Sequence, residues 1–174
     1  MGETVLFLSA DYFVLLALLV FARGMDFLST WVATPRLVLE GNPIAKWLGW
    51  KWGGLINLVA CFSCAVLPLP AIVVVTTSLL VAARNFQGAW LMRTMGEHNY
   101  RYWMSTQLIA GSRRLLIICL LAQTALLAII GVALVWFGGN LLVPIGVGLG
   151  ILVYVAAVLI YSLLAFARRR PHGN

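Results

Sequence analysis

The segment RGMDFLSTWVATPRLVLEGNPIAK, residues 23–46, places two charged side chains in an apolar stretch and then interrupts that stretch. Arg23 and Asp26 are three residues apart, so on a helix they face the same way and can neutralise each other. A charge inside membrane hydrocarbon costs at least about 2.5 to 3.5 kcal/mol, so such residues are paired, hydrated or functional. Pro35 then ends the helix. The segment therefore predicts a membrane helix with a polar site close to a helix break.

The composition around this segment is that of a polytopic membrane protein. Of the 174 residues, 63% are hydrophobic and 10% are charged, and the mean hydropathy is +1.00. The length suits one domain, residues 1–174, with four or five spans of about 20 residues each. The net charge of +7 comes from Lys and Arg residues that flank apolar runs, where they orient the chain and contact anionic lipids. We expect an all-α transmembrane bundle with membrane lipids, and no nucleic acid, as partners.

Five spans are the preferred topology, and four are the alternative. The five are expected at residues 12–35, 47–67, 70–90, 115–137 and 141–167, with a cytoplasmic amphipathic loop at 91–114. The choice depends on residues 53–83, which contain no charge and are interrupted by Leu-Pro-Leu-Pro. One helix of that length would extend about 46 Å, well beyond a core of about 30 Å, so we expect a hairpin. The positive-inside rule then places the N-terminus outside and the C-terminus in the cytoplasm.

Two shorter features are expected at the membrane surface and between helices. Asn42 favours the N-cap position and Pro43 the first helical position, so a short interfacial helix should begin there. In the last span, Gly146 and Gly150 have the small-xxx-small spacing that lets two helices approach closely. We interpret this pair as a packing face, either inside the subunit or between subunits.

Polar residues near the helix break form the candidate site for a substrate or ion. Thr30 continues the stripe of Arg23 and Asp26 along the first helix. Further polar residues at the same expected depth could converge with them on one pocket. The full candidate set is Arg23, Asp26, Thr30, Glu40, Asn42, Asn57, Arg84 and Asn85. The alternative is that Arg23 and Asp26 form a structural ion pair that only joins helices.

No catalytic residue, metal site or cofactor is predicted. Cys61 and Cys64 form a C-x-x-C inside an apolar span, but no second Cys or His pair lies near them in sequence, so helix packing is the preferred interpretation. Glu97 and His98 are interpreted as a solvated pair in a loop, with a contribution to a site at the cytoplasmic surface as the alternative. The sequence contains no G-x-S-x-G, H-E-x-x-H or P-loop motif.

Two short segments near the break read Asp26-Phe-Leu-Ser29-Thr30 and Glu40-Gly41-Asn42-Pro43. In them the chain resembles a family of small multi-spanning prokaryotic membrane proteins of unknown function, whose signature is Asp-x-x-Ser/Thr-Thr followed by Glu-x-Asn-Pro. Asn85 extends the match, and the resemblance covers about residues 12–92. The resemblance implies a polar site, a hairpin at Leu-Pro-Leu-Pro and a prokaryotic inner (plasma) membrane, but it implies no reaction.

Three classes of function fit these features. A transporter or ion-conducting protein would use Asp26 and Glu40 as cation or proton sites, and a chain this short would then require a homo-oligomer. An accessory subunit of a larger membrane complex would use its Gly-rich and aromatic faces for packing. A membrane enzyme acting on a lipid headgroup would use the same acids, with arginines holding phosphate. We rank transport first, the accessory role nearly level with it, and the enzyme third.

Overall fold

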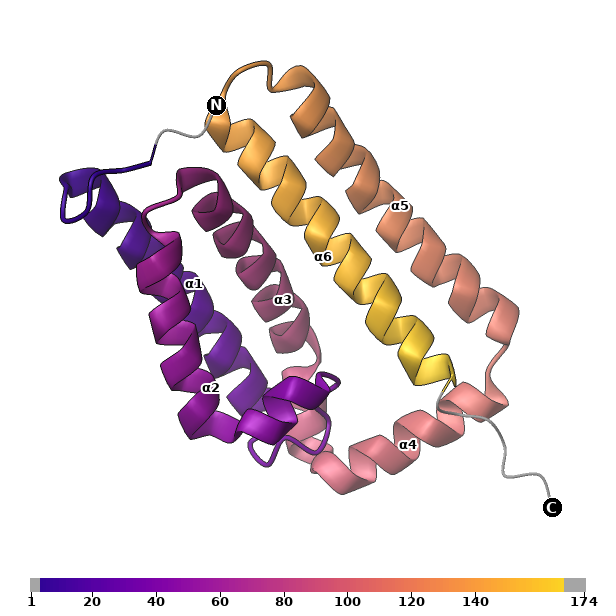
Figure 1. The fold of residues 1–174 in the computed structure, drawn as a ribbon. Coiled ribbons are helices and arrows are strands. Elements are labelled where there is room, and N and C mark those ends of the chain that lie inside the picture. Colours follow the sequence, from indigo (N-terminus) through magenta and orange to yellow (C-terminus); the bar gives the residue numbers. More distant parts are fainter. Residues whose placement is uncertain (1–3, 168–174) are drawn as a thin grey trace.

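The computed structural model describes residues 4–167, and these residues form six helices and no strand (Figure 1). The helices are α1 (Ala10–Ala33), α2 (Pro43–Cys64), α3 (Pro68–Met95), α4 (Glu97–Ala110), α5 (Arg113–Phe137) and α6 (Leu142–Ala167). Four of them, α1, α3, α5 and α6, are long and apolar enough to cross a membrane. The prediction of an all-helical integral membrane bundle is confirmed. The tail that holds His172 and the arginines at 168–170, expected in the cytoplasm, lies outside the described residues.

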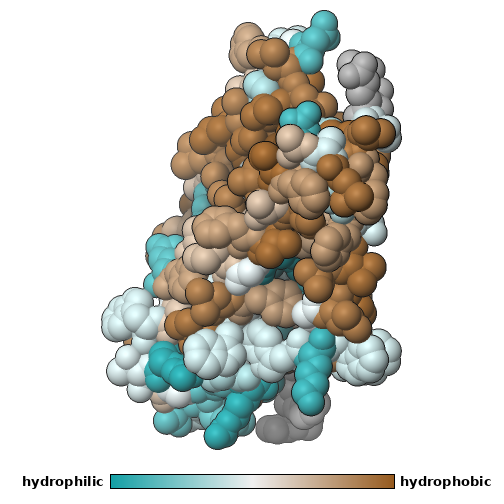
Figure 2. All heavy atoms as spheres, turned by 90° about the vertical axis from the view of Figure 1, so that its left-hand side faces the viewer, coloured by the Kyte–Doolittle hydropathy of each residue, from teal (hydrophilic) through white to brown (hydrophobic). Residues whose placement is uncertain are grey.

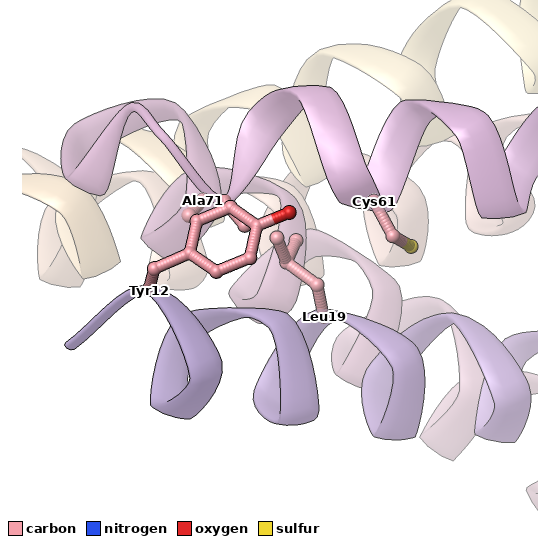
Figure 3. Close-up of a cluster of buried hydrophobic side chains, with 5 residues drawn as sticks. Tyr12, Leu19, Cys61 and Ala71 are labelled. Carbon is pink, nitrogen blue, oxygen red and sulfur yellow. The ribbon is translucent and has the colours of Figure 1, made fainter. Parts of the chain in front are cut away.

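Helices α1 and α2 run antiparallel. The hydroxyl of Tyr12, near the start of α1, donates to the carbonyl oxygen of Phe62 at the end of α2 (3.4 Å). The indole N–H of Trp50, near the start of α2, donates to the carbonyl oxygen of Pro35 just beyond α1 (2.9 Å). Figure 3 shows Tyr12 and Leu19 of α1 facing Cys61 of α2, in a buried cluster that also includes residue 71 of α3. The first three helices therefore share one core.

The break between α2 and α3 falls at residues 65–67, so the chain does not continue as one helix through 53–83. Pro68 begins α3, where a missing N–H costs nothing because the first turn has no partner for it. Helix α3 then runs parallel to α1, since Ser78 pairs with Arg23 and, further along both helices, Asn85 pairs with Thr30. The return from the end of α1 to the start of α3 is made by α2.

Helix α2 begins at Pro43, and the Asn42 side chain accepts from the N–H of Ile44 (3.0 Å) as an N-cap. A kink follows at Gly49, whose φ of 63° lies in the left-handed region that favours glycine. The helical residues before this kink occupy the place where the short interfacial helix is expected. Helix α2 is not among the four helices that are apolar and long enough to be spans.

The structure refines the connection expected after the third span, which we expect to be partly helical along the membrane surface. The third span was expected to end at residue 90 and to be followed by a loop at 91–114, but α3 continues to Met95 and α4 begins at Glu97. Gly96, with a φ of 78°, makes the sharp turn between them. Apolarity falls near residue 90, but the helix continues because residues 91–95 contain no Gly or Pro that would end it before Gly96. The expected loop is therefore the last turn of α3 followed by a separate helix.

Helices α5 and α6 form a second layer, with α6 lying between α5 and α3 (Figure 1). A Cβ on Gly146 would lie 2.7 Å from Ile72 of α3, and one on Gly150 would lie 2.7 Å from Thr76 of α3. The hydroxyl of Thr77 also donates to the carbonyl oxygen of Gly150 (3.0 Å). Both glycines thus face another helix of the same chain.

The face formed by α1 and α2 is mostly apolar above and polar at its lower end (Figure 2). Figure 2 shows hydrophobic residues over most of the α1 and α2 side and hydrophilic ones at the end where α4 lies in Figure 1. Large apolar side chains such as Phe21, Ile129 and Trp136 are exposed, as expected where lipid is the solvent. The polar end is where the segment after α1 meets α4.

Candidate functional site

The centre of the α1–α3 layer holds a group of four side chains, Arg23, Asp26, Asn57 and Ser78, which we call the central polar cluster. The guanidinium of Arg23 donates through Nη1 to Asp26 Oδ2 (2.8 Å) and to Ser78 Oγ (3.2 Å). Its Nε donates to Asn57 Oδ1 (2.7 Å), and Nη2 donates to the same oxygen. Asn57 in turn donates to the carbonyl oxygen of Gly53 (2.7 Å). One arginine of α1 therefore links its own helix to α2 and α3.

The cluster lies near the middle of α1. Arg23 is one to two residues past the midpoint of Ala10–Ala33, which places its Cα only about 2 Å beyond the centre of that helix. A tilted helix of 24 residues matches a hydrocarbon core of about 30 Å. If α1 crosses the membrane over its length, Arg23 and Asp26 sit near the bilayer midplane.

A second polar contact extends the cluster towards the end of α1. Asn85 of α3 donates through Nδ2 to Ser29 Oγ (3.3 Å) and to Thr30 Oγ1 (3.2 Å). Ser29 is fully buried and donates to the backbone carbonyl oxygen of Asp26 (2.8 Å). The predicted residues Arg23, Asp26, Thr30, Asn57 and Asn85 are thus brought together by the fold.

The remaining predicted residues lie elsewhere. Glu40 accepts from the backbone N–H of Asn42 (2.8 Å), and Asn42 caps α2, so both stabilise the segment between α1 and α2. Arg84 is exposed, and among residues 4–167 its side chain has no hydrogen-bond partner. The eight predicted residues therefore do not all line one pocket.

Sequence reasoning missed two residues. Ser78 is buried and was not chosen because a lone serine in an apolar run gives no signal of its contact with Arg23. Glu97 was interpreted as solvated, yet its Oε2 accepts from the Thr34 hydroxyl (2.7 Å) and from the N–H of Val38 (3.0 Å). Its Oε1 accepts from the N–H of Arg36 (2.9 Å). Contacts between residues about 60 positions apart have no local sequence pattern.

These hydrogen bonds set the charge state of Glu97. Burial alone would raise the pKa of its carboxyl group, but the N–H of Arg36, the hydroxyl of Thr34 and the N–H of Val38 all favour the ionised form. The net effect lowers the pKa of Glu97 below its ordinary value. A carboxylate on α4 thereby holds the backbone that follows α1.

The chemistry available at the central polar cluster depends on which atoms are already used. Arg23 and Asp26 together are neutral, and the pair shows partial exposure, with 27% and 17% of their side-chain surfaces accessible. Within residues 4–167, Asp26 Oδ1 accepts no hydrogen bond, whereas Oδ2 is taken by Arg23. A proton or a small cation at Oδ1 is therefore compatible with this geometry. Within the same residues, no three His, Cys, Asp or Glu side chains gather closely enough to hold a metal.

Comparison of the chain with protein-family models, with curated proteins and with solved structures found no match. The resemblance carried by residues 26–30 and 40–43 therefore stays a prediction. Function is inferred instead from the contacts of the central polar cluster.

Proposed function

We propose that this protein transports a cation, a proton or a small polar solute across a membrane, with Arg23 and Asp26 at the centre of its site. The observation that supports this is a charged pair near the middle of an apolar helix, partly accessible and with one carboxylate oxygen unused. Ionisable groups at this depth are costly, and in membrane proteins they mark ion and substrate pathways. Thr30 and Asn85 extend the polar path from the pair towards the end of α1.

The proposed topology has five crossings, with α2 as the additional one. Two parallel helices, α1 and α3, require the chain to return between them, and α2 contacts the end of α1 through Trp50 and the start of α1 through Phe62. The N-terminus would then lie outside, and α4 and the C-terminus in the cytoplasm, because Lys and Arg residues flank the helix ends on that side. An inner (plasma) membrane of a prokaryote is the proposed location.

A proton is the cargo that the cluster accommodates with least rearrangement. Because Asp26 is already paired with Arg23, a metal cation and a proton would both have to compete with the guanidinium for the carboxylate, and they differ in the space that they need. Protonation of Asp26 requires no additional space, and Arg23 keeps its hydrogen bonds to Asn57 and Ser78. A small polar solute would need to replace some of these bonds. A homo-oligomer is proposed as the working unit because one chain contributes few polar residues to its interior.

An accessory role in a larger membrane complex is the second candidate, and one observation favours it. The donors of Arg23 are satisfied by α1, α2 and α3 of the same chain, which is what a purely structural link between helices requires. A structural pair can often be replaced by apolar residues without loss of stability, whereas a transport site cannot be replaced without loss of activity. The two candidates therefore differ in a measurable way.

The test is proton uptake into proteoliposomes that contain a pH-sensitive dye and carry an imposed pH gradient or membrane potential. Asp26→Asn keeps the size and removes the titrating group, so transport predicts loss of the protein-dependent flux. The matched control is Asp11→Asn, the same change at an exposed position in the first turn of the same helix, which should keep the flux. The same variants tested with monovalent cations, and with a thermal-shift screen of small solutes, cover the other cargoes.

The double variant Arg23→Leu with Asp26→Leu separates the two candidates. If it folds and has lost a flux that the wild type shows, the transport proposal is supported. If wild type and Asp26→Asn are alike under every gradient and solute, and the double leucine variant is as stable as wild type, the transport proposal is wrong. The accessory role would then be tested by identifying the proteins that copurify with the chain from its native membrane.

A further inference from the structure

A pocket of about 440 Å³ opens at the polar end of the bundle, away from the central polar cluster. Its walls come from the end of α1, the segment after it, the end of α3 and the first turn of α4. The polar side chains that line it are those of Arg36, Arg93, Glu97, His98 and Asn99. We call it the end pocket. Because none of these residues belongs to the proposed transport site, the two sites can be tested separately.

We propose that the end pocket binds a phosphate group, that of an anionic lipid. Arg36 and Arg93 supply the charge, and both side chains are exposed. Within residues 4–167 the ion pair that forms is Arg23 with Asp26, so neither arginine of the pocket makes a direct ion pair there, although the charge of Arg36 acts on Glu97 at longer range. Two guanidinium groups at one pocket, without a direct ion pair within residues 4–167, suit a phosphate, whose oxygens accept the paired N–H donors of arginine.

The acidic residue of the pocket does not cancel this charge by direct pairing. Both carboxylate oxygens of Glu97 accept hydrogen bonds from the segment at residues 34–38. The carboxylate is therefore directed into that segment, and its two oxygens are engaged at 2.7 to 3.0 Å. With two arginines against one glutamate, the pocket has a net positive charge even when His98 is neutral.

The start of α4 adds backbone N–H donors that also favour an anion. Gly96 precedes the helix and supplies no side-chain cap, and the first backbone hydrogen bond of the helix runs from the N–H of Tyr100 to the carbonyl oxygen of Gly96 (2.9 Å). The N–H groups of residues 97–99 thus have no hydrogen-bond acceptor within α4, and His98 and Asn99 line the pocket. A helix start favours an anion by both its free N–H groups and its dipole.

The position of the pocket favours a lipid over a soluble anion. The Arg93 guanidinium lies over the Trp31 ring, 5.7 Å from its centroid, and Trp residues are enriched at the headgroup level of membranes. Leu28 and Trp31 are both half-exposed on α1, shortly before the residues of that helix that line the pocket. They give the acyl chains of a lipid an apolar surface below its phosphate.

The test uses the full-length protein in detergent, with binding of added dioleoyl phosphatidylglycerol followed by native mass spectrometry. Dioleoyl phosphatidylcholine serves as the neutral comparison. Wild type should bind phosphatidylglycerol more tightly than phosphatidylcholine. Arg36→Gln or Arg93→Gln should weaken the binding of phosphatidylglycerol about tenfold, a change of about 1.4 kcal/mol, because each removes a charged hydrogen-bond donor. Arg36→Gln leaves the backbone N–H that binds Glu97 in place, so it tests the pocket even if Arg93→Gln destabilises the fold.

The matched control is Arg101→Gln, which removes the same charge from an exposed position of α4 that does not line the pocket. Its binding of phosphatidylglycerol should equal that of wild type. Equal loss in Arg101→Gln and Arg36→Gln would mean that general charge attracts the lipid and would overturn the proposal. Unchanged binding in the Arg36→Gln and Arg93→Gln double variant would also overturn it. Inorganic phosphate that displaces the lipid at millimolar concentration would overturn the lipid assignment in favour of a soluble phosphate compound.

Discussion

Gly150 of α6 is the position where the structure makes the most quantitative prediction. A Cβ at this position would lie 2.7 Å from Thr76 Cβ and 3.0 Å from the carbonyl oxygen of Val73, both on α3. Carbon atoms in contact prefer about 3.5 to 4.0 Å, so Gly150→Ala must push α6 and α3 apart locally by roughly 1 Å. Overpacking of this kind costs about 1 to 3 kcal/mol, and the better helix propensity of alanine offsets at most about 1 kcal/mol.

We therefore expect Gly150→Ala to lower the free energy of unfolding by about 1 to 2 kcal/mol, and Gly150→Leu to lower it further. For soluble chains of this size, that corresponds to a melting temperature lower by about 2 to 8 °C. The assay is thermal unfolding in detergent followed by circular dichroism, with size-exclusion chromatography on the same samples. The hydrogen bond from Thr77 to the carbonyl oxygen of Gly150, 3.0 Å long, should be strained by the same displacement.

The matched control is Gly24→Ala, the same change inside α1, where an added Cβ meets nothing within 4 Å. It should leave the melting temperature unchanged or raise it. Thr76→Gly combined with Gly150→Ala should recover part of the loss, because it removes the carbon atom at 2.7 Å. A melting temperature for Gly150→Ala equal to that of wild type and of Gly24→Ala would refute the close packing of α6 on α3.

Three further predictions concern the polar end and the topology. Because the pKa of Glu97 is lowered on folding, its contribution to stability is complete above its ordinary pKa of about 4.3 and is lost as the pH falls through the lowered value. Below that pH, the melting temperature of wild type should therefore fall further than that of Glu97→Gln. Trp50→Phe should cost about 1 kcal/mol because it removes the indole donor to Pro35, with Trp52→Phe, exposed and close by, as its control. In a cysteine-free background, single cysteines at positions 46 and 101 should react with membrane-impermeant reagents from the same, cytoplasmic side; labelling of position 46 from the opposite side would contradict the five-span topology.

The parts of the structure that the sequence predicted correctly are those set by near neighbours in the chain. Arg23 and Asp26 are three residues apart, and helical geometry alone makes them partners. Asn42 and Pro43 mark the start of α2 because capping and the missing proline N–H act within one turn. Apolar composition over about 20 residues identified membrane helices because lipid requires every backbone group to be satisfied within the helix.

The parts decided only by the tertiary structure depend on residues far apart in the sequence. Ser78 and Asn57 complete the hydrogen bonds of Arg23 because α2 and α3 pack on α1 at that depth. Glu97 holds the segment after α1 across about 60 residues, and nothing in its own neighbourhood distinguishes it from a solvated acid. Arg84 shares the polarity of the candidate site but is exposed, and within residues 4–167 it makes no hydrogen bond to the site. Composition and spacing determine which groups a helix presents, whereas only packing determines which of those groups meet.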